Sequence, residues 1–365
     1  MSQLTPDLDL QLKLVKRSFI LLTIVLVISL LSFVGWIFSV ERLKYFISGV
    51  VAMNPLTSLC FISLVIALRI KLKYKGHGSK QAIANIITLL IFGIVFSKLI
   101  AILVGWDYSL DQLMFANEIN NDAVAGFANR MAPNTAFCFV LLATSILFFY
   151  KLHSFFLFVA QATSVLALMV AVFSILGYIF GAQEFYEVQD YIPMALNSGI
   201  CFFLFSLAIL FASPGIGIMQ QLTSKYSGSY VAWRLFVPAF ILPVLIGLFR
   251  LWGQRSGMYN LEFGSALFVT SMILFFLSLI WVNTLLLNRR EQKSQEIIAE
   301  KNYLAALVEQ TSDAILSTDP YLNIMSWNKG AEDIYGYKKE DVIGKPLGSF
   351  LKSTLEPEAS EKLLA

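Results

Sequence analysis

Charged residues are scarce in this sequence: Asp, Glu, Lys and Arg make up 14% of it, against 57% for apolar residues. The formal net charge is only +3, so no strong basic field indicates a nucleic-acid partner. Three cysteines are too few for a framework of disulfides. Phenylalanine, in contrast, occurs 31 times. This composition is typical of an integral membrane protein, and no nucleic acid is expected among its partners.

Motifs of known catalytic centres are missing as well. The sequence has no P-loop, no glycine fingerprint of a dinucleotide site and no cluster of metal-ligating residues. Its two histidines, His77 and His153, stand outside any metal-ligand spacing and lack the neighbours of a phosphoacceptor helix. We therefore predict no catalytic residue, no metal site and no visible enzyme in this chain, and the sequence names no cofactor.

The apolar residues are gathered in long runs. Eight of these runs are long enough to cross about 30 Å of hydrocarbon as helices. They lie near residues 18–38, 48–69, 82–104, 134–150, 155–180, 194–212, 235–250 and 264–287. The predicted fold class is mainly α: a polytopic membrane helical bundle of about eight spans in three to four hairpin repeats. A long signalling helix and the start of an α+β module are expected to follow it.

Charges in the loops indicate the orientation of the spans. Basic residues gather on one side, namely Lys13, Lys16, Arg17, Lys71, Lys73, Lys75, Lys80, Arg289, Arg290 and Lys293. Acidic residues gather in two loops on the other side, namely Asp107, Asp111, Glu118, Asp122, Glu184, Glu187 and Asp190. The positive-inside rule then places both termini in the cytoplasm. We expect a multi-pass protein whose first partner is the lipid bilayer.

A short pattern recurs at the start of three spans. It reads Met, three residues, Thr or Ser, two residues, Cys and Phe, and it occupies Met53–Phe61, Met131–Phe139 and Met194–Phe202. All three cysteines fall in it. A glycine and an aromatic residue end each preceding span, at Gly35-Trp36, Gly105-Trp106 and Gly177-Tyr178. We predict three helical hairpins in parallel arrangement, with a faint fourth copy that opens at Gly264-Ser265.

The repeated residues have more than one interpretation. Met, Thr or Ser, and Cys share one helical face, where small residues and hydroxyls let membrane helices pack closely. Alternatively, three helix N-termini meet near the outer surface and form a sensory pocket whose dipoles favour an anionic or polar group. The candidate pocket residues are Trp36, Thr57, Cys60, Lys98, Trp106, Asp111, Thr135, Cys138, Ser198 and Cys201. A redox role of the cysteines is a third interpretation, although a thiol in an apolar run is usually inert.

Lys98 is the one charged residue well inside a predicted span. An intramembrane charge is by default a candidate functional residue. Because Lys98 lies only eight residues before Trp106, its stem can also snorkel to the outer interface, and we expect this second arrangement. Asp107 and Asp111 are its candidate partners.

A long stretch of the sequence, Ser265–Gln310, contains neither glycine nor proline. Its first part is apolar and its second part is charged, so we predict one helix roughly 70 Å long, with a joint near Asn288–Arg290 as the alternative. Ile297, Leu304 and Val308 form a weak heptad-like stripe. This stripe is either a solvated face or the seam of a dimeric coiled coil, and a homodimer is the expected assembly.

The sequence changes character after this helix. Ala314–Thr318 and Ile324–Trp327 are predicted strands, and Asn328 can cap a short helix that Gly336 ends. The segment resembles the start of a PAS domain through the motif residues Asp319, Trp327, Asn328, Glu332, Gly336, Tyr337 and Gly344. The resemblance implies that the later strands are missing, so we expect the sequence to be truncated inside that domain.

The membrane half is similar to the multi-span N-terminal regions of bacterial PAS-containing sensor proteins. The similar residues are Asp111-Gln112-Leu113, Met131–Ala136, Met194-Ala195-Leu196, Gly257-Met258-Tyr259 and Glu262-Phe263-Gly264. Such proteins are chiefly sensor histidine kinases of two-component phosphorelay systems and sometimes diguanylate cyclases. The resemblance implies a location in the bacterial inner (plasma) membrane, and as partners a downstream kinase or cyclase output domain and a response regulator.

The predicted domains are a membrane sensor domain at 1–287, a helical or coiled-coil linker at 288–306 and the N-terminal part of a PAS domain at 307–365. We expect a sensor that relays a periplasmic or membrane stimulus through the helix to the PAS domain. A transporter-like carrier with a regulatory PAS tail and a passive membrane anchor are the alternatives. The spans show no matched broken helices and little buried charge, which favours the sensor over the carrier.

Overall fold

The computed structural model describes residues 7–45, 51–74, 78–106, 115, 118–119, 129–149, 154–181, 193–225 and 227–350. The chain divides into two compact units, Met1–Phe275 and Phe276–Ala365, and the boundary falls inside one long helix. Each unit has a hydrophobic core of its own.

The first unit is built from helices. They are α1 (Leu8–Ile37), α2 (Glu41–Lys44), α3 (Pro55–Lys73), α4 (Gly78–Val104), α6 (Pro133–Phe148), α7 (Ser154–Phe180), α8 (Leu196–Ala212), α9 (Ile218–Leu222), α10 (Ser227–Arg255) and the start of α11 (Leu261–Gln310). Asn54 caps α3, because its side chain accepts a hydrogen bond of 2.9 Å from the N–H of Leu56. Pro55 and Pro133 occupy the first turns of α3 and α6, where a missing N–H is harmless.

Six of the described helices are long and apolar enough to cross a membrane: α1, α3, α4, α7, α10 and α11. The predicted total of eight spans is not confirmed. The predicted spans at 134–150 and 194–212 correspond to α6 and α8, which have only 16 and 17 residues. At about 1.5 Å per residue these two helices are about 24–26 Å long, which is less than the thickness of the hydrocarbon core.

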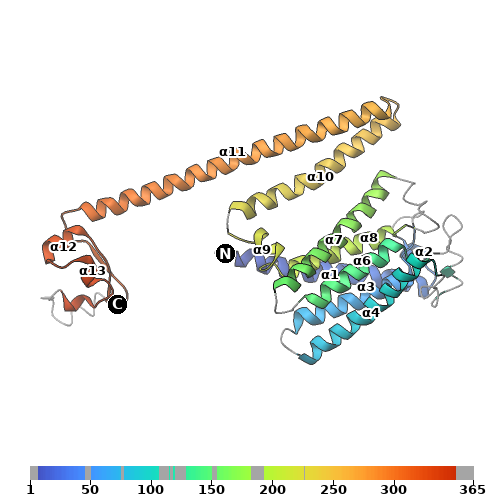
Figure 1. Ribbon diagram of the computed structural model, residues 1–365, viewed down its shortest axis with the longest axis horizontal. Coiled ribbons are helices and arrows are strands. Elements are labelled where there is room, and N and C mark those ends of the chain that lie inside the picture. Colours follow the sequence, from blue (N-terminus) through green and yellow to red (C-terminus); the bar gives the residue numbers. More distant parts are fainter. Residues whose placement is uncertain are drawn as a thin grey trace. The chain divides into compact units, whose positions relative to one another are not determined.

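Three helical hairpins form a closed ring through the contacts between neighbouring helices. Figure 1 shows these helices side by side in one bundle. The hairpins are α1 with α3, α4 with α6, and α7 with α8. Each hairpin packs on the next, through α3 against α4, α6 against α7, and α8 against α1. Because α3, α6 and α8 also contact one another, they form the inside of the ring. The three predicted hairpins are therefore observed, whereas α10 and α11, which would carry the faint fourth copy, do not close the ring.

The inner helices meet at three phenylalanine rings. Phe61, Phe139 and Phe202 are fully buried, and their ring centroids lie 4.6–4.7 Å apart in all three pairings. Each ring lies six residues after the start of its helix, at Pro55, Pro133 and Leu196. The three helices therefore begin at one level, at what we call the polar end of the bundle. The rings mark an approximate threefold axis of the three repeats.

The segments that lead into the inner helices are extended and buried. Residues 51–54, 129–132 and 193–195 precede α3, α6 and α8 without helical hydrogen bonds. Met53, Met131 and Met194, the first residues of the repeated pattern, are at most 1% exposed in these segments. Irregular backbone inside a membrane protein must be covered by protein, and here the hairpins cover it.

The helix α11 is continuous over 50 residues, a length of about 75 Å. The predicted single helix is confirmed, and there is no break near Asn288–Arg290. Within the chain, α11 buries almost none of its side chains. The preceding helix α10 contains Pro238 and Pro243 and still runs through both.

The second unit adds a small α+β fold to the end of α11. Strands β1 (Leu316–Thr318) and β2 (Ile324–Trp327) pair antiparallel, with Leu316 opposite Trp327 and a bulge after Ser317. Helices α12 (Lys329–Tyr335) and α13 (Lys339–Val342) and the short helix η3 (Leu347–Ser349) follow. The core of this unit consists of Ile324, Trp327, Ala331 and Val342. Both predicted strands and the helix after Asn328 are confirmed.

Candidate functional site

The three cysteines are buried and free. They precede the axial phenylalanines by one residue, so they point about 100° away from the axis, toward neighbouring helices. Cys201 interacts there with the hydroxyl of Ser29 on α1. Cys60 and Cys138 are equally enclosed, at 0% exposure. The structure thus gives the cysteines a packing environment and does not bring them together as a redox centre.

The repeated hydroxyls of Thr57, Thr135 and Ser198 lie in the first turns of α3, α6 and α8. Each of these residues is only 2–3% exposed. Each lies four residues before an axial phenylalanine, so it stands one turn closer to the polar end on the same helix face. Among the residues that the structure describes, none forms a hydrogen bond with any of these three hydroxyls. The structure therefore brings the three predicted hydroxyls to one level and leaves them available.

Asparagine side chains connect the helix starts to the neighbouring segments. Asn54 donates to the carbonyl of Asn129 at 2.6 Å, and Asn129 donates back to the carbonyl of Ala52 at 3.1 Å. Asn197 donates to the carbonyl of Lys44 at 3.1 Å. These bonds satisfy buried backbone oxygens that no helix or sheet could satisfy.

Two of the three predicted aromatic residues hold the extended segments. The indole N–H of Trp36 donates to the carbonyl of Met53 at 2.8 Å, and the hydroxyl of Tyr178 donates to the carbonyl of Met194 at 2.9 Å. Trp106 departs from this arrangement, because it is 71% exposed. Of the three aromatic residues that end the outer spans, Trp36 and Tyr178 thus bind the extended segments, whereas Trp106 is exposed.

The charged residues of the candidate site, Lys98 and Asp111 among them, differ in whether and where the structure describes them. Lys98 is 4% exposed and is engaged in an interaction. That its ammonium group snorkels to the outer interface stays a prediction. Its candidate partners Asp107 and Asp111 lie outside the described residues, as does the rest of that loop up to residue 114. Sequence reasoning missed Lys44, which is 6% exposed and whose ammonium group lies 4.2 Å from the centre of the Trp36 ring. Only its nearness to Trp36 in the sequence could have drawn attention to it.

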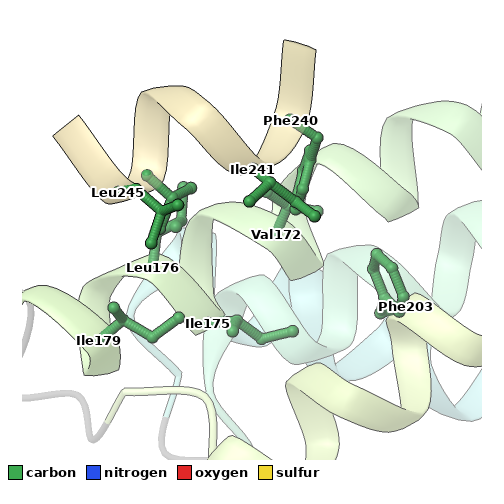
Figure 2. Close-up of a pocket in the computed structure, with 9 residues that line it drawn as sticks. Val172, Ile175, Leu176, Ile179, Phe203, Phe240, Ile241 and Leu245 are labelled. Carbon is green, nitrogen blue, oxygen red and sulfur yellow. The ribbon is translucent and has the colours of Figure 1, made fainter. Parts of the chain in front are cut away.

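An apolar hollow lies between α7 and α10 (Figure 2). Val172, Leu176 and Ile179 on α7 face Phe240 and Leu245 on α10, and the cavity encloses about 300 Å³. Its lining offers almost no polar surface, so it suits a hydrocarbon chain and not a polar ligand. Among the described residues, no group of three or more His, Cys, Asp or Glu could hold a metal ion.

In the second unit, Asn328 is the centre of a buried hydrogen-bond network. Its side-chain oxygen accepts from the N–H groups of Ala331 (2.9 Å) and Ile315 (2.8 Å), so it caps α12 and fixes the entry to β1. Its side-chain nitrogen donates to the carbonyls of Val308 (2.8 Å) and Asp313 (2.9 Å). One side chain thereby connects the last turn of α11 to the fold that follows.

The other predicted motif residues hold the hairpin and the short helices. Asp319 accepts hydrogen bonds from the N–H groups of Tyr321 and Asn323 at 2.9 and 2.8 Å, and these bonds and the Asn323 side chain lower its pKa. Trp327 is 1% exposed and donates to the carbonyl of Tyr337 at 3.2 Å. Gly336 ends α12 with φ of +78°, where a residue with a Cβ would be strained. Gly344 also has a positive φ, +76°.

Among the described carboxylates of this unit, Glu332 has the most strongly lowered pKa. It accepts a hydrogen bond of 2.8 Å from the N–H of Lys339 and lies 3.0 Å from the ammonium group of Lys329. The Lys339 bond first, and the Lys329 bond second, lower the pKa of Glu332 to about 2. Glu332 therefore joins α12 to α13 as a charged group.

Gly330 was missed by the sequence reasoning. A Cβ at this position would lie 2.4 Å from the carbonyl oxygen of Asp313 and 2.5 Å from that of Thr311. Only glycine lets the start of α12 approach the turn after α11 so closely.

This arrangement of a strand hairpin, capped helix and glycine turns agrees with the comparison with known families. A model of the PAS fold matches residues 302–363. Residues 302–363 are a PAS domain. Its match begins within the last turns of α11, where Asn328 binds the carbonyl of Val308. A PAS domain suggests a role in signal sensing, and the apolar helices before it suggest association with a membrane. No curated protein and no solved structure matches the chain.

Proposed function

We propose that this chain is the input region of a membrane signalling protein. The three-hairpin bundle responds to a stimulus, and α11 carries the response to the PAS domain. The observation that supports this most directly is the continuous helix Leu261–Gln310, apolar in its first half and held by Asn328 at its end. A stimulus can shift the helix only if it binds two states of the bundle with unequal affinity.

The connection between the bundle and α10 supports the same role. The carbonyl of Thr223 at the end of α9 accepts from the N–H of Asp7 at 3.0 Å, and the carbonyl of Leu222 accepts from the indole of Trp233 on α10 at 2.8 Å. The fully buried Gln161 of α7 accepts a hydrogen bond from the N–H of Ile218 at the start of α9. The short helix α9 is thus bonded to α1, α7 and α10, and a shift in the ring reaches α10 through it.

The finer features of the proposal rest on the distribution of charged residues between the loops and on the resemblance to bacterial PAS-containing sensor proteins. We place the protein in the bacterial inner membrane as a multi-pass homodimer, with both termini in the cytoplasm and the polar end of the bundle on the outer side. The proposed output is a sensor histidine kinase of a two-component phosphorelay that acts on a response regulator. A diguanylate cyclase is the alternative output.

Insertions in α11 test the proposal. Residues are inserted between Asn288 and Gln310 of the full-length gene product, and phosphate transfer from labelled ATP is measured in membranes. A rigid coiled-coil relay predicts that an insertion of seven residues keeps regulated output, whereas two or four residues lock it on or off. Equal behaviour of all insertion lengths contradicts the relay. Synthesis of cyclic dinucleotide from GTP, in place of phosphate transfer, identifies the cyclase.

Disulfide cross-linking tests the dimer separately. Ile297→Cys and Leu304→Cys lie on the predicted seam, and Gln295→Cys on the opposite face serves as the control. Cross-linked dimers are expected for the two seam positions only. Equal cross-linking at Gln295→Cys would argue against a packed coiled coil.

A transporter-like carrier is the second candidate, because parallel repeats also occur in transporters. Uptake of solutes into vesicles that contain the protein would support it. A passive anchor predicts that deletion of the first six predicted spans, with the last two retained, leaves output unchanged. The sensor predicts that this deletion abolishes regulation.

A further inference from the structure

An arginine on α3 contacts α1 within the apolar part of the first hairpin. The guanidinium group of Arg69 donates hydrogen bonds to the hydroxyl of Thr23 and, at 3.4 Å, to the carbonyl of Phe19. We call this the Arg69 contact. Arg69 is half-buried, and its Nε atom is enclosed with no hydrogen-bond partner among the described residues. Because an unpaired buried N–H group is costly, this guanidinium group calls for a further acceptor.

No carboxylate compensates the positive charge of Arg69 within the part of the chain that the structure describes. From residue 10 to residue 106 the sequence contains a single acidic residue, and it lies on α2, at the other end of the hairpin. The two acids at the start of α1 are engaged there, since Asp7 caps the helix and Asp9 pairs with Lys13 at 2.5 Å. An uncompensated charge in an apolar helix is unfavourable, and it marks a candidate binding site.

Two further cations lie on one side of the Arg69 contact. Lys73 follows Arg69 by one turn on the same face of α3, and Lys16 precedes Phe19 by three residues on the same face of α1. Because the two helices are the antiparallel partners of one hairpin, both lysines lie about one turn beyond the contact, toward the start of α1 and the end of α3. Both are exposed, and neither has an ion pair among the described residues. Three cations from two helices thus lie at this end of the hairpin without a negative partner.

The side chains beside the Arg69 contact are apolar and exposed. Ile20 and Ile24 on α1 and Ile66 on α3 lie within one turn of the contacting residues, and they are 41–58% exposed. A soluble acidic protein would have to enter the hydrocarbon between these side chains to reach Arg69. A lipid, in contrast, already has its acyl chains at this depth, and its phosphate can be drawn to a cation near the end of a span.

We infer that the Arg69 contact binds one anionic phospholipid, whose phosphate lies between Arg69, Lys16 and Lys73 and whose acyl chains lie on the exposed isoleucines. The planar guanidinium group suits a phosphate, because its N–H groups can donate to two phosphate oxygens at once. A zwitterionic lipid also carries a cationic group, which the two lysines would repel, so a headgroup of net negative charge is favoured. This inference adds a lipid ligand to the first hairpin and does not depend on the proposed signalling output.

Native mass spectrometry of the full chain in a neutral detergent tests the inference. Phosphatidylglycerol and phosphatidylcholine with identical acyl chains are added in turn, and the number of lipids that stay bound is counted. We expect one phosphatidylglycerol per chain at concentrations at which phosphatidylcholine is lost. Inorganic phosphate and polyglutamate are the soluble competitors, and neither is expected to displace the lipid. In nanodiscs, phosphatidylglycerol should also raise the unfolding midpoint, since it binds the folded state.

Variants link the bound lipid to the Arg69 contact. Arg69→Gln is expected to weaken phosphatidylglycerol binding by about tenfold or more, from the loss of hydrogen bonds between two charged groups. Arg42→Gln is the control, because Arg42 is an exposed arginine at the other end of the same hairpin. Lys16→Gln and Lys73→Gln should weaken binding by about fivefold each. They carry the test if Arg69→Gln does not fold, because both lysine side chains are exposed.

The inference is overturned if phosphatidylcholine binds as tightly as phosphatidylglycerol, because the surface would then take any lipid of the bilayer. Displacement by inorganic phosphate or by polyglutamate overturns it as well, since the ligand would then be a soluble anion. It also fails if Arg69→Gln, or both lysine variants, bind the lipid like Arg42→Gln. These measurements need no signalling output, so their failure leaves the α11 insertion test unaffected.

Discussion

The side-chain nitrogen of Asn328 donates a hydrogen bond of 2.8 Å to the carbonyl oxygen of Val308. The two residues belong to the cap of α12 and to the last turn of α11, so one buried side chain joins the long helix to the PAS fold. Few other polar contacts of the described residues connect these elements; the ion pair between Lys339 and Glu309, at 3.9 Å, is exposed. Exposed ion pairs contribute little to stability.

Asn328→Ala is expected to loosen the PAS domain and to separate it from α11. It removes a helix cap of about 1 kcal/mol and the partner of the Ile315 N–H and of the Val308 and Asp313 carbonyls, so we expect a loss of about 2–4 kcal/mol. Hydrogen exchange of the full chain, followed at residues 308–335, measures the effect. Asn328→Asp keeps both acceptor bonds and loses the donors, and it should weaken protection near Val308 more than within α12. Unchanged exchange at Val308 in both variants would show that the bond does not hold α11.

Gly330→Ala is expected to destabilise the PAS domain without changing any polar group. The added methyl group would lie 2.4 Å from the Asp313 carbonyl oxygen, so the turn after α11 must move away. Overpacking of this kind costs about 1–3 kcal/mol or more. Gly348→Ala is the matched control, because no atom lies within 4 Å of its Cβ position. Equal protection against hydrogen exchange in both variants would contradict the close approach.

Glu332 is expected to make the PAS domain sensitive to acid. Its pKa in the folded protein, about 2, lies below its ordinary value of 4.5, so its stabilising contribution is complete above pH 4.5. This contribution is lost as the pH falls from about 4.5 to 2, and Asp319, whose pKa is also lowered, acts in the same direction. Cleavage by pepsin between residues 311 and 350 should accelerate over this range.

Glu332→Gln identifies the source of that acid sensitivity. The variant should be cleaved faster than the wild type at pH 4.5, and the difference should shrink toward pH 2, where the wild type is increasingly protonated. Glu340→Gln, an exposed carboxylate on α13, controls for the effect of one charge. A constant ratio of the two cleavage rates across the range would refute the role of Glu332.

Phe202→Ala is expected to destabilise the three-hairpin ring. It removes one of three mutually contacting buried rings, and such a substitution in a core costs about 3–5 kcal/mol. Phe158→Ala on α7 is the control, since Phe158 is 52% exposed. Thermal unfolding in detergent should show a large loss for the first variant and almost none for the second. Equal losses would mean that the axis does not carry the stability of the bundle.

The three copies of the repeated pattern could be predicted from the sequence, but the directions in which its side chains point could not. The spacing of Met, Thr or Ser, Cys and Phe predicted three equivalent helix starts, and the structure brings those starts to one level. Which of the repeated residues faces the axis depends on how the hairpins pack, and the axis is occupied by Phe61, Phe139 and Phe202. The cysteines, one residue earlier, point to neighbouring helices.

The burial of charged side chains was the least predictable feature of the bundle. Lys98 and Lys44 both lie near tryptophans, where a long stem usually reaches water, and both are buried. Their burial depends on long-range packing of segments that are far apart in the sequence, such as Asn197 against Lys44. In the PAS domain, by contrast, strands, cap and glycine turn were predicted correctly, because turns and caps are set by local residues.

The short inner helices have a consequence for the way the bundle assembles. α6 and α8 are too short to cross a bilayer by themselves, and extended backbone precedes both; in the third hairpin Tyr178 supplies a partner for this backbone. Lipid offers no such partner. Each inner helix therefore becomes a stable membrane element only together with the outer helix that precedes it. We therefore expect the hairpin, and not the single helix, to be the unit of insertion during biosynthesis, with the ring built in the order of the hairpins along the chain.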